Sequence, residues 1–240
     1  MRVILKYSFY ILLITTCSVF SQSKKVLSGP MLSYVNSYGT QIWFLLDGSA
    51  ENIEIDIRDY ENDNLMEYKF HVTNDDKADE IPFTVSIETL VPNTEYIASI
   101  FVDGVFIQDI DIFTKRPHLD DTQFLVGYNL GNASREMFSH MKKTHSDFMV
   151  WLGGHVSFDF PISLDNLMSN YMDLRKEAEL AAFISSTPQI STWNELDYGL
   201  DFNSSLLLQD TSHIAFDFFW PNALQKTYNY TFFDYGLYQR

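Results

Sequence analysis

The sequence predicts an α+β protein of two parts, a β-sandwich followed by an α/β layer. Residues 28–115 contain seven short runs with apolar residues at or near a period of two, separated by turn residues. This pattern is typical of antiparallel strands. Residues 122–240 instead alternate short apolar strands with stretches of helical periodicity, which favours a mainly buried sheet covered by helices. A polar, proline-containing segment at 115–121 marks the expected domain boundary.

The first part is expected to form a fibronectin III-like or immunoglobulin-like sandwich. Asp103-Gly104 predicts a tight hairpin turn between its last two strands. Leu90 to Tyr96 resembles the L-x-P-x-T-x-Y corner of fibronectin type III-like domains. That resemblance implies a Tyr96 side chain that packs inward, with its hydroxyl bonded to nearby backbone. The expected strands are Met31–Asn36, Thr40–Leu46, Asn52–Ile57, Leu65–Val72, Thr84–Ile87, Thr94–Val102 and Val105–Phe113.

The second part is expected to place polar loops at the carboxyl ends of its strands. Three such loops are Gly127-Tyr128-Asn129, Gly153-Gly154-His155 and Trp193-Asn194-Glu195. Open α/β sheets hold their ligands in loops of this position, so the three segments are expected to form one site. The expected strands are Phe124–Gly127, Phe148–Leu152 and Gln189–Trp193, and the expected helices are Ser134–Thr144, Leu164–Ser185 and Leu208–Phe219.

The amino terminus reads as a cleavable signal peptide, residues 1–21. A basic start precedes an apolar run at 9–19 and a small-residue cleavage site before Gln22. The apolar run is shorter than the about 20 residues that a transmembrane helix needs, and no later segment approaches that length. We therefore expect a secreted, periplasmic or cell-surface protein without a stable membrane span. Lipidation at Cys17 is the weaker alternative, because Thr16 fits poorly before a lipoprotein cysteine.

Composition narrows the classes of partner. The chain carries 32 acidic and 16 basic residues, a formal net charge of −16. Such a balance repels phosphate polyanions, so nucleic-acid binding is not expected. Cys17 is the single cysteine and would leave with the signal peptide, so no disulfide framework is expected. The fold must then depend on its apolar core.

Several segments resemble one family, the alkaline phosphatase D (PhoD-like) metallophosphoesterases. Asp147–His155 and Thr192–Gly199 resemble its two central metal-binding loops, which read like W-L-G-D-N-V-Y and W-D-D-H-D-Y-G. Asn170–Arg175, Ser186–Trp193 and Phe216–Asn222 resemble further family segments, in the same order. The resemblance implies that the second part is a partial metallophosphoesterase-type layer. Its relatives would use Ca, Fe or Zn-type metals to activate water at a two-metal centre.

Carried onto this chain, the resemblance implies a depleted site. Gly154 stands at the bridging aspartate and Leu196 at a histidine, while Asp197 is kept. Two neighbouring dications repel unless an anionic ligand lies between them, and a glycine offers no side chain. We therefore expect no turnover and assign no catalytic residue, metal or cofactor. Arg175 and His155 remain candidates for contacting a phosphate. The vestigial metal-site positions are Asn129, Gly154, Ser157, Asn194, Glu195 and Asp197.

Three functions stay open from the sequence. The first is a degenerate, inactive PhoD-like protein, and the second is an active phosphomonoesterase or phosphodiesterase with altered ligands. The third is a non-enzymatic surface binding module that works through the sandwich. The segment Tyr230–Asp234 resembles the family's F-F-L-L-D strand and lies shortly before Arg240. We therefore expect only about half of the phosphatase layer, truncated at a sheet edge that a protein partner would cover.

Overall fold

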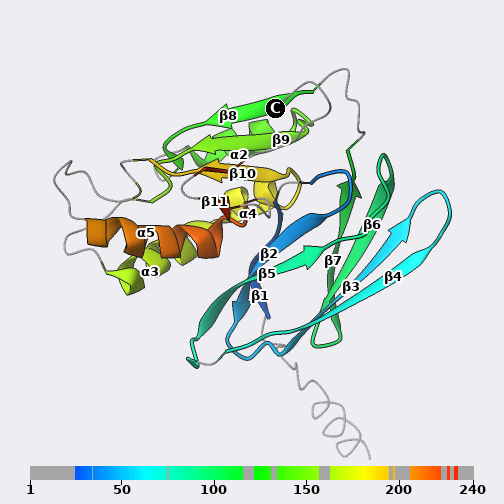
Figure 1. Ribbon diagram of the computed structural model, residues 1–240, viewed down its shortest axis with the longest axis horizontal. Coiled ribbons are helices and arrows are strands. Elements are labelled where there is room, and N and C mark those ends of the chain that lie inside the picture. Colours follow the sequence, from blue (N-terminus) through cyan, green and yellow to red (C-terminus); the bar gives the residue numbers. More distant parts are fainter. Residues whose placement is uncertain are drawn as a thin grey trace, which may run out of the picture.

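The computed structural model describes residues 25–33, 35–74, 76–115, 122–130, 134–156, 163–194, 197, 206–222, 226–227 and 230–231. The expected signal peptide and the residues 116–121 of the expected boundary lie outside these ranges. Figure 1 shows two sheets beside each other. A third sheet, with its helices, lies against one of these two sheets.

The first part consists of two antiparallel sheets packed face to face, with strand orders β1-β2-β5 and β4-β3-β6-β7. Strand β3 alternates as expected, burying Ile53, Ile55 and Ile57. These side chains meet Phe44 and Leu46 of β2 in one core cluster between the sheets. The first strand begins at Val26 and ends at Leu32, earlier than the expected Met31–Asn36, and the other bounds shift by a few residues. The strands are β1 (Val26–Leu32), β2 (Thr40–Asp47), β3 (Asn52–Asp59), β4 (Leu65–His71), β5 (Glu80–Ile87), β6 (Glu95–Val102) and β7 (Val105–Phe113).

The two local features predicted in this part are confirmed. Asp103 and Gly104 have φ angles of 50° and 75°, as a type I′ hairpin turn requires. Tyr96 is buried, and its hydroxyl oxygen accepts a hydrogen bond from the Val91 N–H at 2.8 Å. This bond ties the loop before β6 to the core.

The second part is a parallel sheet of order β10-β9-β8 with helices against it (Figure 1). One expectation is wrong, because the single helix predicted over 164–185 is two helices. Glu177 takes an extended conformation between them (φ −67°, ψ 125°), and α4 then contacts β1. The elements are β8 (Phe124–Gly127), α2 (Arg135–Lys142), β9 (Phe148–Leu152), α3 (Leu164–Arg175), α4 (Ala178–Ile184), β10 (Gln189–Thr192), α5 (Leu206–Phe219), β11 (Lys226–Thr227) and β12 (Tyr230–Thr231).

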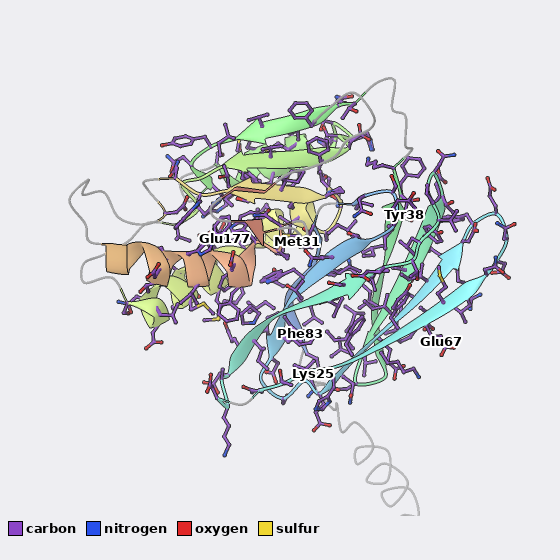
Figure 2. The ribbon with its side chains drawn as sticks, viewed as in Figure 1. Lys25, Met31, Tyr38, Glu67, Phe83 and Glu177 are labelled. Carbon is purple, nitrogen blue, oxygen red and sulfur yellow. The ribbon has the colours of Figure 1, made fainter. Side chains whose placement is uncertain are left out.

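The two parts share a second core cluster. Met31, Trp43 and Leu45 of the β1-β2-β5 sheet pack with Tyr171 and Phe219 of helices α3 and α5. This sheet is therefore covered on both faces, which explains why five consecutive residues of β2 are buried. Figure 2 marks Met31 where β1 meets the helices.

Replacing Tyr96 with phenylalanine should remove the hydroxyl while keeping the ring. The partly buried Val91 N–H would lose its partner, so the free energy of unfolding should fall by about 0.5–1.5 kcal/mol. The control is Tyr68→Phe, because the Tyr68 hydroxyl donates to the Glu88 carbonyl at a solvent-exposed position. Urea unfolding of both variants should show the smaller loss for Tyr68→Phe, and equal losses would contradict the role assigned to Tyr96.

Candidate functional site

The three loops that the sequence predicts to converge do meet, at the carboxyl ends of strands β8, β9 and β10. The Asn129 N–H, after β8, donates to the Gly153 carbonyl at 2.9 Å. From the loop after β10, the Asn194 side-chain amide donates to the Leu152 carbonyl at 3.2 Å. Gly153 has a φ of 92°, and a Cβ added to it would lie 2.5 Å from the Asn194 Cγ. Gly153 therefore allows the close approach of the two loops.

The Asp197 carboxylate is committed to backbone hydrogen bonds. Its Oδ2 accepts from the Gly154 N–H at 2.8 Å and the Asn194 N–H at 3.0 Å, and its Oδ1 accepts from the His155 N–H at 2.7 Å. A carboxylate has about four lone-pair positions, so three of them are used inside the protein. The side chain is buried, and it joins the loop after β9 to the loop after β10. Asp197 thus acts as a clamp between loops.

Gly154 contributes only its backbone to this arrangement. Its φ of 73° lies in the left-handed region, and its N–H is directed at Asp197. No side chain at this position can bridge two cations. Of the other vestigial positions, Ser157 and Glu195 lie outside the described residues. Within the ranges that are described, no group of three or more His, Cys, Asp or Glu side chains could hold a metal ion. The side chains that the structure describes at these loops therefore do not make up the donor set of a two-metal centre.

His155 lies in the interior behind the loops. Its Nε2 is 2.7 Å from the Ser191 Oγ and 3.0 Å from the Thr192 carbonyl oxygen, and its ring lies 4.6 Å from the Trp220 ring. Burial lowers the pKa of His155, while the nearby Asp197 carboxylate partly opposes the shift. The imidazole is consequently neutral near pH 7 and has no exposed surface for a phosphate.

Arg175, the other candidate for a phosphate contact, is also fully buried. Its guanidinium carbon lies 3.9 Å from the Trp220 ring centroid and 5.1 Å from that of Trp43. Its Nη2 donates to the Phe219 carbonyl at 2.8 Å. Burial lowers the pKa of Arg175 to about 9, so the group stays charged at neutral pH. Two aromatic faces and one carbonyl occupy the positions that a phosphate would need.

Sequence reasoning missed Asn222, which closes the edge of β10. Its Oδ1 accepts from the Ser191 N–H at 3.1 Å, and its Nδ2 donates to the Ser191 carbonyl at 2.8 Å. The side-chain amide thereby takes the place of a neighbouring strand. No local pattern could have predicted this, because the two residues lie 31 positions apart.

The fold and the loops together define a class of protein. It consists of two antiparallel sheets joined to a parallel α/β layer, in which the loops at the strand ends converge. A solved structure of PhoD has this architecture: it matches with a TM-score of 0.71 and 16% identity over 89% of this chain. The predicted PhoD-like fold is therefore confirmed, and at this identity the likeness concerns the fold alone. The chain spans about half of that protein, since the match covers 51% of the PhoD chain.

Other comparisons add little. No protein-family model and no curated protein sequence matches the chain. The sensor domain of the anti-sigma factor RsgI4 from Pseudobacteroides cellulosolvens aligns with 40% of this chain and 92% of its own at 14% identity, with a TM-score of 0.30. A glycosyl hydrolase family 2 member from Bacteroides cellulosilyticus aligns with 78% of this chain and 38% of its own at 11% identity, with a TM-score of 0.26. Both scores are too low to support an argument. Among the described helices, none is long and apolar enough to span a membrane.

The Asp197→Ala variant should lose the clamp between the loops. Two buried N–H groups and one partly buried N–H group would lose their acceptor, so the free energy of unfolding should fall by about 3 kcal/mol or more. Asp173→Ala is the control, because Asp173 is exposed and pairs only with Lys176 at the surface. Chemical denaturation should show a loss below about 1 kcal/mol for the control. Similar losses in the two variants would refute the clamp.

His155 should make stability depend on pH. Because its pKa is lowered in the folded protein, the unfolded chain takes up the proton first as the pH falls through about 6.5. The free energy of unfolding should therefore decrease from pH 7 to pH 5. Denaturation across this range should give a shallower dependence for His155→Phe, whatever its absolute stability. The same change at an exposed histidine, His71→Phe, is the matched control.

Proposed function

We propose that this chain is an exported PhoD-like protein whose phosphoesterase site no longer supports turnover. It would consist of a fibronectin III-like sandwich followed by a partial metallophosphoesterase-type layer. Any present role would then be binding. Export is inferred from the leader-like residues 1–21, and sequencing the amino terminus of the exported chain should find Gln22 if the leader is removed there.

The main support for a loss of activity is the hydrogen bonding of the Asp197 carboxylate. In a two-metal site a carboxylate at this position would direct its oxygens at a cation. Here those oxygens accept three backbone hydrogen bonds, and Gly154 supplies no second carboxylate. Releasing Asp197 to a metal would leave buried N–H groups without partners, at about 1–3 kcal/mol each. The loops thus keep their positions by using the group that a metal would need.

The alternative function is phosphoester hydrolysis with altered ligands. It is favoured by the approach of Asn129 and Asn194 to the same loop, at Gly153 and Leu152 respectively. Amide oxygens can coordinate hard cations such as Ca²⁺, although they carry no charge to offset the repulsion between two of them. A non-enzymatic binding module working through the sandwich is the other alternative. Hydrolysis assays and partner-binding experiments distinguish these two alternatives from the main proposal.

Purified full chain should show no metal-dependent hydrolysis of p-nitrophenyl phosphate or bis(p-nitrophenyl) phosphate. The assay should include added Ca²⁺, Fe³⁺, Mn²⁺ or Zn²⁺, with an authentic alkaline phosphatase as positive control. Elemental analysis of the same preparation should find metal well below one ion per chain. The expected result follows from the missing side chain at Gly154 and from the three backbone hydrogen bonds that the Asp197 carboxylate already accepts.

Turnover that requires a metal and disappears in Asn129→Ala or Asn194→Ala would sink the inactive assignment and support the altered-ligand enzyme. Turnover that survives both substitutions would point to a contaminating phosphatase. The exposed-site control Asp173→Ala should leave any turnover unchanged. Binding of a partner that persists after removal of residues 118–240 would instead support the sandwich as the working module.

A further inference from the structure

Five of the six edge strands in the three larger sheets carry a device that blocks pairing with another strand. Proline, charged side chains, bulges and covered edges are the usual devices. Strand β1 contains Pro30 and two register shifts, and β5 contains Pro82. Strand β4 presents charged side chains, among them the labelled Glu67 in Figure 2, and β7 presents Asp109 and Asp111. The edge of β10 is closed by Asn222.

In the part of the chain that the structure describes, the sixth edge, β8, carries none of these devices. Its residues Phe124–Gly127 include no charge and no proline, and its pairing with β9 runs without a register shift. It lies at the outer side of the parallel sheet in Figure 1. Among the described residues, β9 is its only strand neighbour. An open, uncharged and regular edge is a template for adding another strand.

The outer face of the same sheet is also apolar. The inner face, with Met149 and Trp151, packs in the second core cluster. On the outer face, Phe124 stacks on Phe148 with 5.1 Å between ring centroids, yet Phe124 is 51% exposed and Val126 is 56% exposed. Leu152 on this face is 45% exposed. Parallel sheets are normally covered on both faces, and yet these three side chains keep about half of their surface exposed.

We propose that β8 pairs with β8 of a second copy of this chain, in antiparallel orientation across a two-fold axis perpendicular to the sheet. Such an axis keeps the outer faces on the same side, so Phe124 and Val126 lie beside their equivalents in the second copy. The result is a continuous six-stranded sheet. Its two outer edges are both β10, closed by Asn222, so the assembly ends at a dimer and does not grow into a fibre.

A second copy is favoured over another protein because the edge is self-complementary. The paired strands carry no charge, so two copies meet without like charges in contact, although each chain has a net charge of −16. Strands of four residues bury far less than the about 1,200 Å² of a stable interface, so the dimer is weak. Salt screens the overall repulsion between the copies, so added salt should strengthen it.

The test is sedimentation equilibrium of the full chain, expressed with its own leader so that the host performs any cleavage. From about 1 µM to about 300 µM, the wild-type chain should pass from monomer to dimer, with a lower dissociation constant at 0.5 M than at 0.1 M NaCl. The edge variant Val126→Lys should raise the dissociation constant at least about tenfold. Phe124→Lys provides a second variant with the same expected effect.

The matched control is Leu65→Lys, which adds the same charge at an exposed aliphatic position on β4, an edge strand that already carries charged side chains. It should dimerise as the wild type does. A wild-type chain that stays monomeric throughout the range at both salt concentrations would overturn the proposal. So would equal effects of Val126→Lys and Leu65→Lys, a dimer that weakens with salt, or growth beyond the dimer.

Discussion

The burial of Arg175 between two tryptophans is the interaction on which the arrangement of the whole chain depends. Trp43 comes from the sandwich and Trp220 from the end of α5, and the guanidinium lies between them. The Ser28 hydroxyl donates to the Arg175 carbonyl, and the Trp43 indole donates to the Phe218 carbonyl at 2.8 Å. No carboxylate among the described residues pairs with this buried charge, and two π faces and the Phe219 carbonyl offset part of the cost of burying it. Arg175 therefore fixes how the α/β layer sits on the sandwich.

In the same layer, backbone and polar groups hold the three strand-end loops together. The glycines and strand ends bring three loops together, as they would to surround a ligand. Several polar groups of the loops pair with one another: Asp197 accepts from three N–H groups and the His155 Nε2 is bonded to Ser191, while the buried His155 Nδ1 has no partner among the described residues. Buried polar groups in folded proteins are generally hydrogen-bonded, and here backbone N–H groups supply the partners of Asp197. These bonds tie the loop after β9 to the loop after β10.

Much of the architecture was predictable because it depends on local patterns. Period-two runs located the strands, the Asp103-Gly104 turn and the Tyr96 corner had local signals, and the convergence of the loops after β8, β9 and β10 followed from parallel pairing. The helix break at Glu177 was not predictable, because the apolar stripe continues through it. What broke the helix is the packing of α4 against β1, which lies about 150 positions earlier.

The sequence by itself determined the strands, the order of the elements and the loss of a carboxylate at Gly154, because each depends on residue identity or on neighbours along the chain. Only the tertiary structure decided what the remaining polar residues do. Arg175 and His155 have the chemistry of phosphate contacts, and the fold buries both among aromatic rings. The same holds for β8, whose lack of charge matters only because it lies at an edge. A side chain's role depends on which distant residues surround it, and folding alone sets those distances.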